Sequence, residues 1–415
     1  MTAVVKRSTR TRVGIVAGRF AGWLSRTLTR GQGATISGRV INKIAPDALE
    51  ELAQGQRVTL VSATNGKTTT TRFLATALAT DGRTVTTNST GANLSSGIAP
   101  TLARATGDGE AVLEVDERVL PRIVDPLGAD LLVFGNLSRD QLDRYGEVHA
   151  VSESWRTTTE AHPGLSVVAN ASDPHVVWAA TPAKVTWVAL GLGWRSDAAT
   201  CPQCGALLQW STDRFECPGC GFAQPETPNR LDAKTLELDG TQIPLDIALP
   251  GKWNLANAAL AVTAAAHLGV DPSTAARSLG SITSVAGRYM SVPIGDGRQA
   301  RVLLAKNPAG WTEVLRFLHD RDTAVVIAVN ARVADGKDPS WLWDVPYELL
   351  RGKHAAASGD RRLDVAVRLR YAEVEHEIDR DPIAAAQELD GDEVHIVASY
   401  TQFSALYRKY GAGRE

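Results

Sequence analysis

The sequence lacks long apolar runs, an excess of charge of either sign, and cysteine outside one short segment. No apolar stretch approaches the ~18 residues of a membrane-spanning helix. The 44 Lys and Arg residues nearly balance the 46 Asp and Glu residues, so whole-molecule charge gives no signal for nucleic-acid binding. With 44% hydrophobic and 22% charged residues, the composition excludes a fibrous or mostly disordered chain. A length of 415 residues predicts two to three domains.

The four cysteines form two C-x-x-C pairs, with twelve residues between the pairs. They are Cys201, Cys204, Cys217 and Cys220. A chain of this length has no need of disulfide staples. Four thiolates at this spacing suit one tetrahedral zinc ion, and without an open coordination position that zinc would be structural. A redox pair and an iron–sulfur cluster are the alternatives.

The first 46 residues carry nine Lys and Arg and no acid. Residues 12–29 predict a basic amphipathic helix. This helix either contacts an anionic membrane surface or packs on the next domain with its charges in solvent, and we favour packing. Arg19 interrupts the apolar stretch 13–24 and no small-residue cleavage site follows, so we expect no secretory signal and a cytoplasmic protein.

From residue 57 onward, short apolar strands alternate with helical stretches, which predicts an α/β fold with a mostly parallel sheet covered on both faces. The expected strands are 58–61, 83–87, 111–115, 131–134, 167–169 and 185–189. Segment 199–224 interrupts the alternation and is expected to be an inserted zinc ribbon. Short strands are expected in 235–249 and an Ala-rich helix in 254–268.

The last part of the chain repeats the alternation of strands and helices, with strands expected at 301–305, 324–329, 354–357 and 394–398. We therefore expect four parts: a basic N-terminal extension, a central ATP-binding domain, the ribbon inserted in it, and a Rossmann-like C-terminal α/β domain. Their boundaries are 1–56, 57–290, 199–224 and 291–415.

A phosphate-binding loop is predicted between strand 58–61 and a helix over 67–80, where the sequence reads SATNGKTTT. Backbone N–H groups at such a helix start face an anion. Lys67 can neutralise the β- and γ-phosphates, and the Thr68 hydroxyl can bind Mg²⁺. Val61 replaces the first Gly of the GxxxxGK[ST] pattern. The alternative is an ordinary helix start capped by Thr64 or Asn65.

With this loop, the sequence after residue 57 resembles the Mur ligase superfamily, whose loop reads TNGKT. The resemblance implies ATP and Mg²⁺ as cofactors. It implies that Glu114, at a strand end, binds Mg²⁺, and that the helix start 251–257 (GKWNLAN) borders the adenine. The alternatives are an ordinary surface position or an ion-pair role for Glu114, and a helix cap for Asn254. The expected ATP-binding residues are Thr64, Asn65, Gly66, Lys67, Thr68, Thr69, Asn254 and Asn257.

Within the superfamily, the cysteine insertion and two C-terminal motifs, 306–310 (KNPAG) and 335–344 (DGKDPSWLWD), resemble the synthetase-like subunits that amidate the D-glutamate of lipid II. The resemblance implies a carbon–nitrogen ligase of peptidoglycan synthesis that works through an acyl phosphate. It also implies a heterodimer with a GatD-like glutaminase subunit at the inner face of the cell membrane. An Asp of 335–344 would complete the partner's Cys-His-Asp arrangement, and we favour Asp338 and Asp344 over Asp335. The alternative is a solvated turn in which Asp344 caps the next element.

The need for a partner also follows from the residues. Release of ammonia from glutamine requires a nucleophile, most often a Cys activated by His, and all four cysteines here are expected to bind zinc.

The sequence departs from the Mur ligase pattern at the place of a second Mg²⁺ site, because Asp140-Gln141 stands where ordinary ligases have an Asp-His pair. Two other functions stay open: an amino-acid ligase of the Mur or folylpolyglutamate type, and a zinc-ribbon nucleic-acid-binding ATPase. The second is disfavoured because Arg214 is the only basic residue in 201–221.

Overall fold

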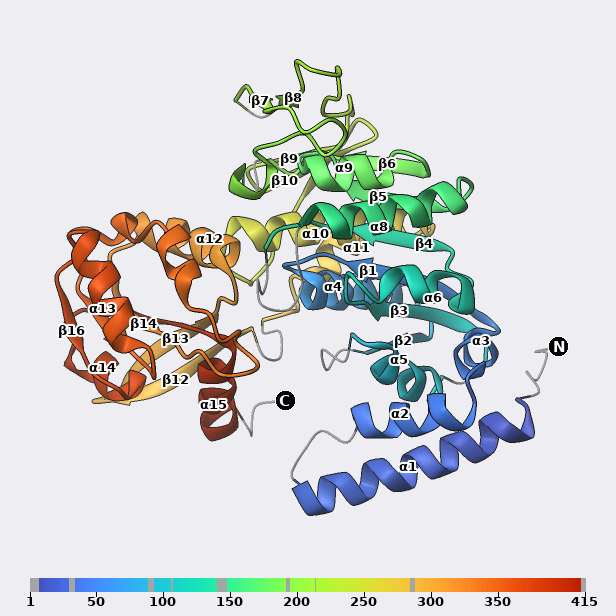
Figure 1. The fold of residues 1–415 in the computed structure, drawn as a ribbon, viewed down its shortest axis with the longest axis horizontal. Coiled ribbons are helices and arrows are strands. Elements are labelled where there is room, and N and C mark those ends of the chain that lie inside the picture. Colours follow the sequence, from blue (N-terminus) through green and yellow to red (C-terminus); the bar gives the residue numbers. More distant parts are fainter. Residues whose placement is uncertain are drawn as a thin grey trace. The chain divides into compact units, whose positions relative to one another are not determined.

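A computed structural model describes the chain in eight stretches: residues 7–29, 34–88, 93–105, 107–139, 148–191, 195–212, 214–283 and 288–411. The chain divides into two compact units. The first comprises Met1–Leu137, Val148–Ala248 and Asn254–Thr283, and the second comprises Ser138–Glu147, Leu249–Trp253 and Ser284–Glu415. Figure 1 labels the helices and strands of both units.

The first unit is built on a six-stranded sheet with the order β2-β3-β1-β4-β5-β6, in which every pair is parallel. Its central strands are runs of Val, Leu and Ala that are buried on both faces, as strands of a covered parallel sheet are. The predicted parallel α/β sheet is confirmed. The strands are β1 Gln56–Ser62, β2 Val85–Thr87, β3 Gly109–Glu114, β4 Leu131–Phe134, β5 Ser166–Asn170 and β6 Lys184–Val188.

Helices follow the strands of this sheet, and two of them begin with the same local signal. Asp173 precedes α9 and accepts hydrogen bonds from the amides of His175 and Val176, while Asp271 precedes α11 and accepts one from Thr274. A proline stands at the first helical position in both, where a missing N–H costs nothing. The helices are α3 Ala48–Ala53, α4 Lys67–Thr80, α5 Ser95–Leu102, α6 Leu120–Leu127, α8 Val148–Ala161, α9 Pro174–Ala180, α10 Lys252–His267 and α11 Pro272–Leu279.

Two N-terminal helices, α1 (Thr9–Thr29) and α2 (Ala34–Ile44), pack against each other (Figure 1). A Cβ atom on Gly18 would lie 2.7 Å from the Ile41 side chain. A Cβ atom on Gly38 would lie 1.6 Å from the carbonyl oxygen of Ser96 in α5. The backbones therefore approach closely only because glycine stands at these positions.

The cysteine segment leaves the first sheet after β6 and contains only short elements. These are the 3₁₀ helix η1 (Arg195–Ala198) and the antiparallel pair β7 (Gln209–Trp210) and β8 (Phe215–Glu216). A three-stranded antiparallel sheet follows, made of β9 Arg230–Asp232, β10 Thr235–Leu238 and β11 Thr241–Pro244.

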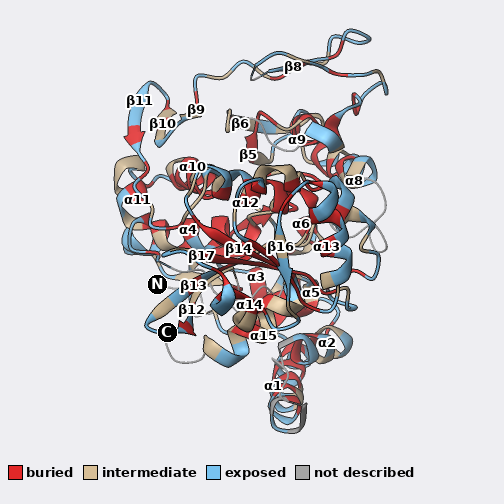
Figure 2. Cartoon of the chain, turned by 90° about the vertical axis from the view of Figure 1, so that its left-hand side faces the viewer, coloured by how far each residue is buried: buried red, intermediate tan, exposed pale blue. Residues whose placement is uncertain are grey.

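The second unit has its own six-stranded sheet, with the order β12-β13-β17-β14-β15-β16. Only β12 pairs antiparallel, and strands β14 and β17 are buried along their whole length (Figure 2). The strands are β12 Tyr289–Gly295, β13 Arg298–Leu304, β14 Ala324–Ala328, β15 Ala355–Ser358, β16 His376–Ile378 and β17 Val394–Ala398. The helices are α12 Pro308–His319, η2 Ser340–Asp344, η3 Tyr347–Leu350, α13 Arg362–Tyr371, α14 Pro382–Glu388 and α15 Tyr400–Tyr410. Among the helices described in both units, none has the length and apolar character needed to cross a bilayer.

Candidate active site

The loop between β1 and α4 is held in shape by a residue that follows β4. The Thr64 amide donates to the Asn136 carbonyl oxygen at 2.7 Å, and the Asn65 amide donates to Asn136 Oδ1 at 3.0 Å. Asn136 Nδ2 returns a bond of 2.8 Å to the Asn65 carbonyl oxygen. Gly66 then adopts φ +89°, a left-handed conformation that favours glycine, and α4 begins at the next residue. The loop thus presents the amino end of α4, where partial positive charge favours an anion.

Glu114 and Thr68 lie side by side at this edge of the sheet. The register pairs Glu114 of β3 with Val61 of β1, just before the loop begins. The Thr68 hydroxyl donates to Glu114 Oε2 at 2.8 Å, and both residues are buried. Asn88 fixes the Glu114 backbone with two hydrogen bonds of 2.8 Å. A hydroxyl and a carboxylate held together in this way offer the hard oxygen ligands that Mg²⁺ prefers.

The ammonium group of Lys67 lies inside the loop. It donates to the carbonyl oxygens of Ala63 and Thr64, and it forms an ion pair of 3.0 Å with Glu117. The Lys67 side chain is 6% exposed and that of Glu117 is 13% exposed. The backbone of Glu117 is in turn fixed by the Trp155 indole N–H, which donates to its carbonyl oxygen at 2.8 Å. The loop therefore contains a buried positive charge paired with a nearly buried carboxylate.

The predicted adenine-side residues lie against the same loop. A Cβ atom on Gly66 would come within 2.2 Å of Asn257 Oδ1, so the α10 side chain sits directly over this glycine. Asn257 Nδ2 donates to Asn254 Oδ1 at 3.4 Å, and both side chains are buried. Asn254 is the third residue of α10 and not its cap, because the helix begins at Lys252.

The structure thus brings the predicted residues 64–69, Glu114, Asn254 and Asn257 into one neighbourhood of the first unit. Asp140 and Gln141 lie outside the described residues. Sequence reasoning missed three residues that shape the site, which are Glu117, Asn88 and Asn136. Only Glu117 carried a signal, since it stands three residues after Glu114 in an acidic stretch. The two asparagines contribute to the site through side-chain hydrogen bonds that no local sequence pattern predicts.

The four cysteine sulfurs gather in one place, with all Sγ atoms within 4.8 Å of one another. Cys201 and Cys220 Sγ are 3.7 Å apart and those of Cys204 and Cys217 are 3.4 Å apart, too far for disulfide bonds. The two C-x-x-C turns repeat each other, since each first Cys amide donates to the carbonyl oxygen five residues on at 2.7 Å, and each following Gly amide returns a bond of 2.9 Å. Tetrahedral Zn–S bonds of ~2.3 Å put sulfurs roughly 3.8 Å apart, so the thiols fit a zinc ion.

The aspartates of segment 335–344 in the second unit have three different environments. Asp335 is buried, and its carboxylate accepts bonds from the backbone amide and hydroxyl of Thr401. Asp338 Oδ1 accepts from the Ser340 amide at 2.9 Å, and hydrogen bonds from this serine lower the pKa of the Asp338 carboxyl. Asp344 forms an ion pair of 3.3 Å with Arg139, and its side chain is 38% exposed.

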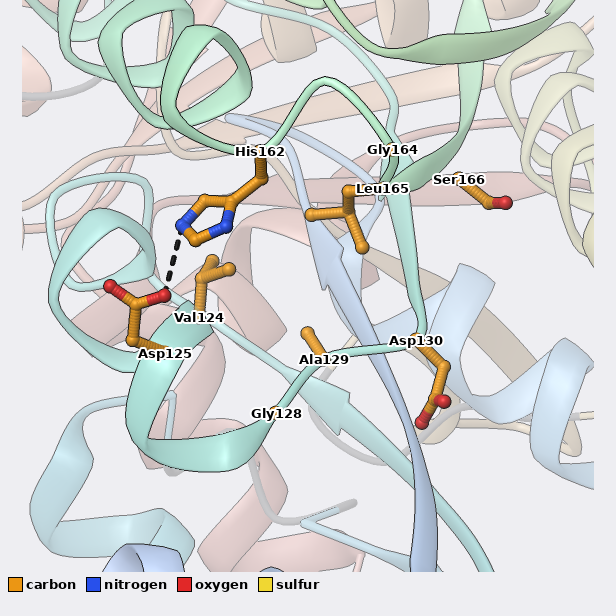
Figure 3. Close-up of a pocket in the computed structure, with 9 residues that line it drawn as sticks. All are labelled: Val124, Asp125, Gly128, Ala129, Asp130, His162, Gly164, Leu165 and Ser166. Atoms are coloured by element: carbon orange, nitrogen blue, oxygen red, sulfur yellow. Dashed lines mark ion pairs between the residues drawn. The ribbon is translucent and has the colours of Figure 1, made fainter.

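A surface pocket in the first unit lies at the other edge of its sheet (Figure 3). Its lining residues lie before β4 and before or at the start of β5, and His162 forms an ion pair of 2.9 Å with Asp125. The amino ends of parallel strands lie opposite the carboxyl ends that carry the β1–α4 loop. This pocket is therefore separate from the candidate site.

Two family models match the chain: the Mur ligase middle domain over residues 61–265 and the MurT ligase C-terminal domain over residues 304–403. The lipid II isoglutaminyl synthase (glutamine-hydrolyzing) subunit MurT of Streptococcus pneumoniae (strain ATCC BAA-255 / R6) is 30% identical, over 87% of this chain and 87% of that protein. The chain belongs to the MurT family. It is an enzyme of the ligase class, and the resemblance seen in its sequence is confirmed.

Solved structures place the MurT family within the Mur ligase fold. A pseudomurein peptide ligase type C from Methanothermus fervidus superimposes with a TM-score of 0.62 at 19% identity, over 92% of this chain and 85% of that chain. A MurF ligase from Thermotoga maritima, solved in complex with ADP, gives 0.60 at 14% identity, over 88% of this chain and 84% of that chain. At these identities the likeness establishes the fold alone.

Proposed function

We propose that this chain is the synthetase subunit of a lipid II isoglutaminyl synthase, which uses ATP to turn the α-carboxyl group of D-glutamate into an amide. The MurT relative bears that name, and the proposal extends it to this chain. The observation that carries it is the convergence of Lys67, Thr68 and Glu114 on the anion-binding loop. Backbone N–H groups of residues 64–69 would bind the ATP phosphates, and Asn254 and Asn257 would border the adenine.

The proposed chemistry has two steps. A carboxylate oxygen of the substrate attacks the γ-phosphorus, ADP leaves, and an acyl phosphate forms. The nitrogen of ammonia then attacks the acyl carbon, inorganic phosphate leaves with the C–O electron pair, and a proton goes to water. Lys67 neutralises charge on the β- and γ-phosphates, for which its ammonium group exchanges Glu117 for phosphate oxygen.

Two metal ions belong to the proposal. Thr68 and Glu114 would hold Mg²⁺, which supplies positive charge to the phosphate oxygens when it is bound. The four-cysteine cluster would hold a structural Zn²⁺, because all four positions are filled by thiols. We assign residues 199–224 to this ribbon, 57–290 to the ATP-binding domain around it, 291–415 to the C-terminal domain and 1–56 to a basic extension.

Ammonia is proposed to come from a GatD-like glutaminase subunit in a heterodimer. All four cysteines of the sequence belong to the sulfur cluster, so no other thiol is present to attack glutamine. Asp344 is the stronger candidate for orienting the partner's catalytic His, because Asp338 already serves its own helical turn. We propose that the complex works in the cytoplasm at the inner face of the membrane, as the resemblance to the lipid II-amidating subunits implies.

Transfer of an oxygen label tests the reaction. Lipid II labelled with ¹⁸O in the D-glutamate α-carboxyl group is incubated with the complex, ATP and ammonium, and the released phosphate is analysed by mass spectrometry. One ¹⁸O atom per phosphate is expected. ATP cleavage without label in the phosphate would exclude the acyl phosphate, and faster ATP cleavage with amino acids than with ammonium would indicate an amino-acid ligase.

A further inference from the structure

The outer face of α1 carries large apolar side chains that no other described element covers. They are Val13, Val16, Phe20, Trp23 and Leu24, and each is between 41% and 68% exposed. At about 100° per residue these positions fall within an arc of roughly 100° on one side of the helix. The rings of Phe20 and Trp23 lie together, with centroids 5.8 Å apart. We call these five residues the α1 apolar face.

The opposite side of α1 is the packed side, and it is made mostly of small residues, together with the buried Ile15. Gly14, Gly18 and Gly22 are buried there, and Gly18 lies against Ile41 of α2. A helix that served only to complete the core would turn its large apolar side chains inward, because their burial is what stabilises packing. Among the described large apolar side chains of α1, Ile15 is buried and the five of the α1 apolar face are exposed, so this face is available to a partner outside the described structure.

The charges around the α1 apolar face identify the occupant. Arg12 and Arg19 are exposed and flank the face next to Trp23. Arg39 and Lys43 are exposed on α2, and the first 46 residues contain no acid. Aromatic side chains bordered by arginines are typical of helices that lie in the interface of an anionic membrane.

We infer that α1 docks the protein on an anionic lipid surface, lying in its plane with Phe20 and Trp23 among the acyl chains and Arg12 and Arg19 at the headgroups. Two copies of the chain are a poorer fit, because a symmetric contact between two such faces would bring like-charged arginines together. The inference rests on the membrane location in the proposed function and deepens it, since it names the residues that would hold the protein there and concerns none of the catalytic steps.

Co-flotation of the full chain with vesicles tests the inference. We expect binding to vesicles of equimolar phosphatidylglycerol and phosphatidylcholine, and weaker binding to phosphatidylcholine alone or at high salt. Phe20→Ser/Trp23→Ser should lower the partition coefficient by at least about tenfold. The matched control is Leu363→Ser/Tyr371→Ser, which removes two exposed apolar side chains from α13 and should change nothing.

Several outcomes would overturn the inference. The wild-type chain could fail to float, or the α1 double variant could bind as well as the control. A dimer in sedimentation velocity that the α1 variant abolishes, without vesicle binding, would make the face a self-association surface. Thermal melting checks that both double variants fold. The assay uses neither ATP nor glutaminase, so its failure would leave the proposed ligase chemistry standing.

Discussion

The ammonium group of Lys67 is a buried charge of the candidate site, held by two carbonyl oxygens and by Glu117. A buried ion pair of this kind is costly to break from one side only, because the remaining charge is left unpaired. Under the proposed function, removing Lys67 therefore has two separable effects, one on phosphate binding and one on stability.

We expect Lys67→Ala to lower the rate of ATP-dependent amidation by about 1000-fold, the scale of losing one well-placed charge-stabilising donor. The same variant should unfold at a lower temperature, because Glu117 loses its partner. Lys67→Ala/Glu117→Gln is the matched control. It should recover thermal stability and stay inactive, whereas an active double variant would contradict the phosphate role.

Substituting Asp338 and Asp344 one at a time distinguishes the roles of the two carboxylates. Asparagine caps a helical turn about as well as aspartate, so Asp338→Asn should leave glutamine-dependent amidation nearly unchanged. Asp344→Asn should stop glutamine-dependent amidation and spare the reaction with ammonium, because only the partner's His loses its carboxylate. Both rates are measured with the partner subunit present. Equal loss of the two reactions in Asp344→Asn would exclude the role.

At this scale the sequence predicted the loop and the neighbouring Glu114, because both stand at the ends of strands. It left Asp338 and Asp344 undecided, since the partner of Asp344 is Arg139, far away in the chain. Asp338 precedes a proline, as do the caps of four helices, Asp173, Asp271, Asn307 and Asp381. That recurrence was present in the sequence and pointed to a capping role.

At the scale of elements, buried strands were the easiest to predict, since β4 and β17 match their expected bounds residue for residue. Short strands such as β16, which is half-buried or exposed at each position, carry too little apolar pattern to be seen. The side of α1 that packs against the protein could not be predicted from the sequence either. The predicted helix 12–29 ends where α1 ends but starts three residues late, since α1 begins at Thr9. Which side packs depends on how closely Gly18 lets Ile41 approach.

The cysteine segment gives a prediction at the same scale. Cys204→Ser should reduce bound zinc from one equivalent per chain to nearly none, because three thiolates and a hydroxyl bind far more weakly. Metal content by plasma mass spectrometry is the measurement. Gln203→Ala, an exposed position in the same turn, is the control and should keep its zinc. Unchanged zinc in Cys204→Ser would refute the four-thiolate site.

At the scale of the whole molecule, each of the two units has its own sheet and core. The second unit contains a buried histidine, His395, whose protonation makes the stability of that unit depend on pH. Burial lowers the pKa of His395 to about 4; Arg301 and Arg321 act in the same direction and Glu393 against it. The ring contacts the Thr323 hydroxyl at 2.9 Å. The folded second unit therefore holds this ring neutral where an unfolded chain would protonate it.

Acid should destabilise the second unit for this reason. Since the unfolded state binds the proton first, stability is full above pH ~6.5 and falls as pH drops toward 4. The loss attributable to His395 is about 2 kcal/mol at pH ~5. Urea unfolding at neutral and acidic pH measures it. His395→Gln should remove this part of the pH dependence, and His267→Gln, an exposed histidine, should not.

The segment that contains the cysteines begins and ends beside Ala189, directly after β6 of the first sheet. The Ala189 amide donates to the Asn229 carbonyl oxygen at 2.9 Å, and the Leu231 amide donates back to Ala189 at 2.8 Å. These two hydrogen bonds hold both ends of the segment together. The entropic cost of closing the loop between them depends only weakly on how many residues it contains. The whole inserted segment can therefore be lengthened, shortened or exchanged, in evolution or by design, without changing the strand order of the first sheet.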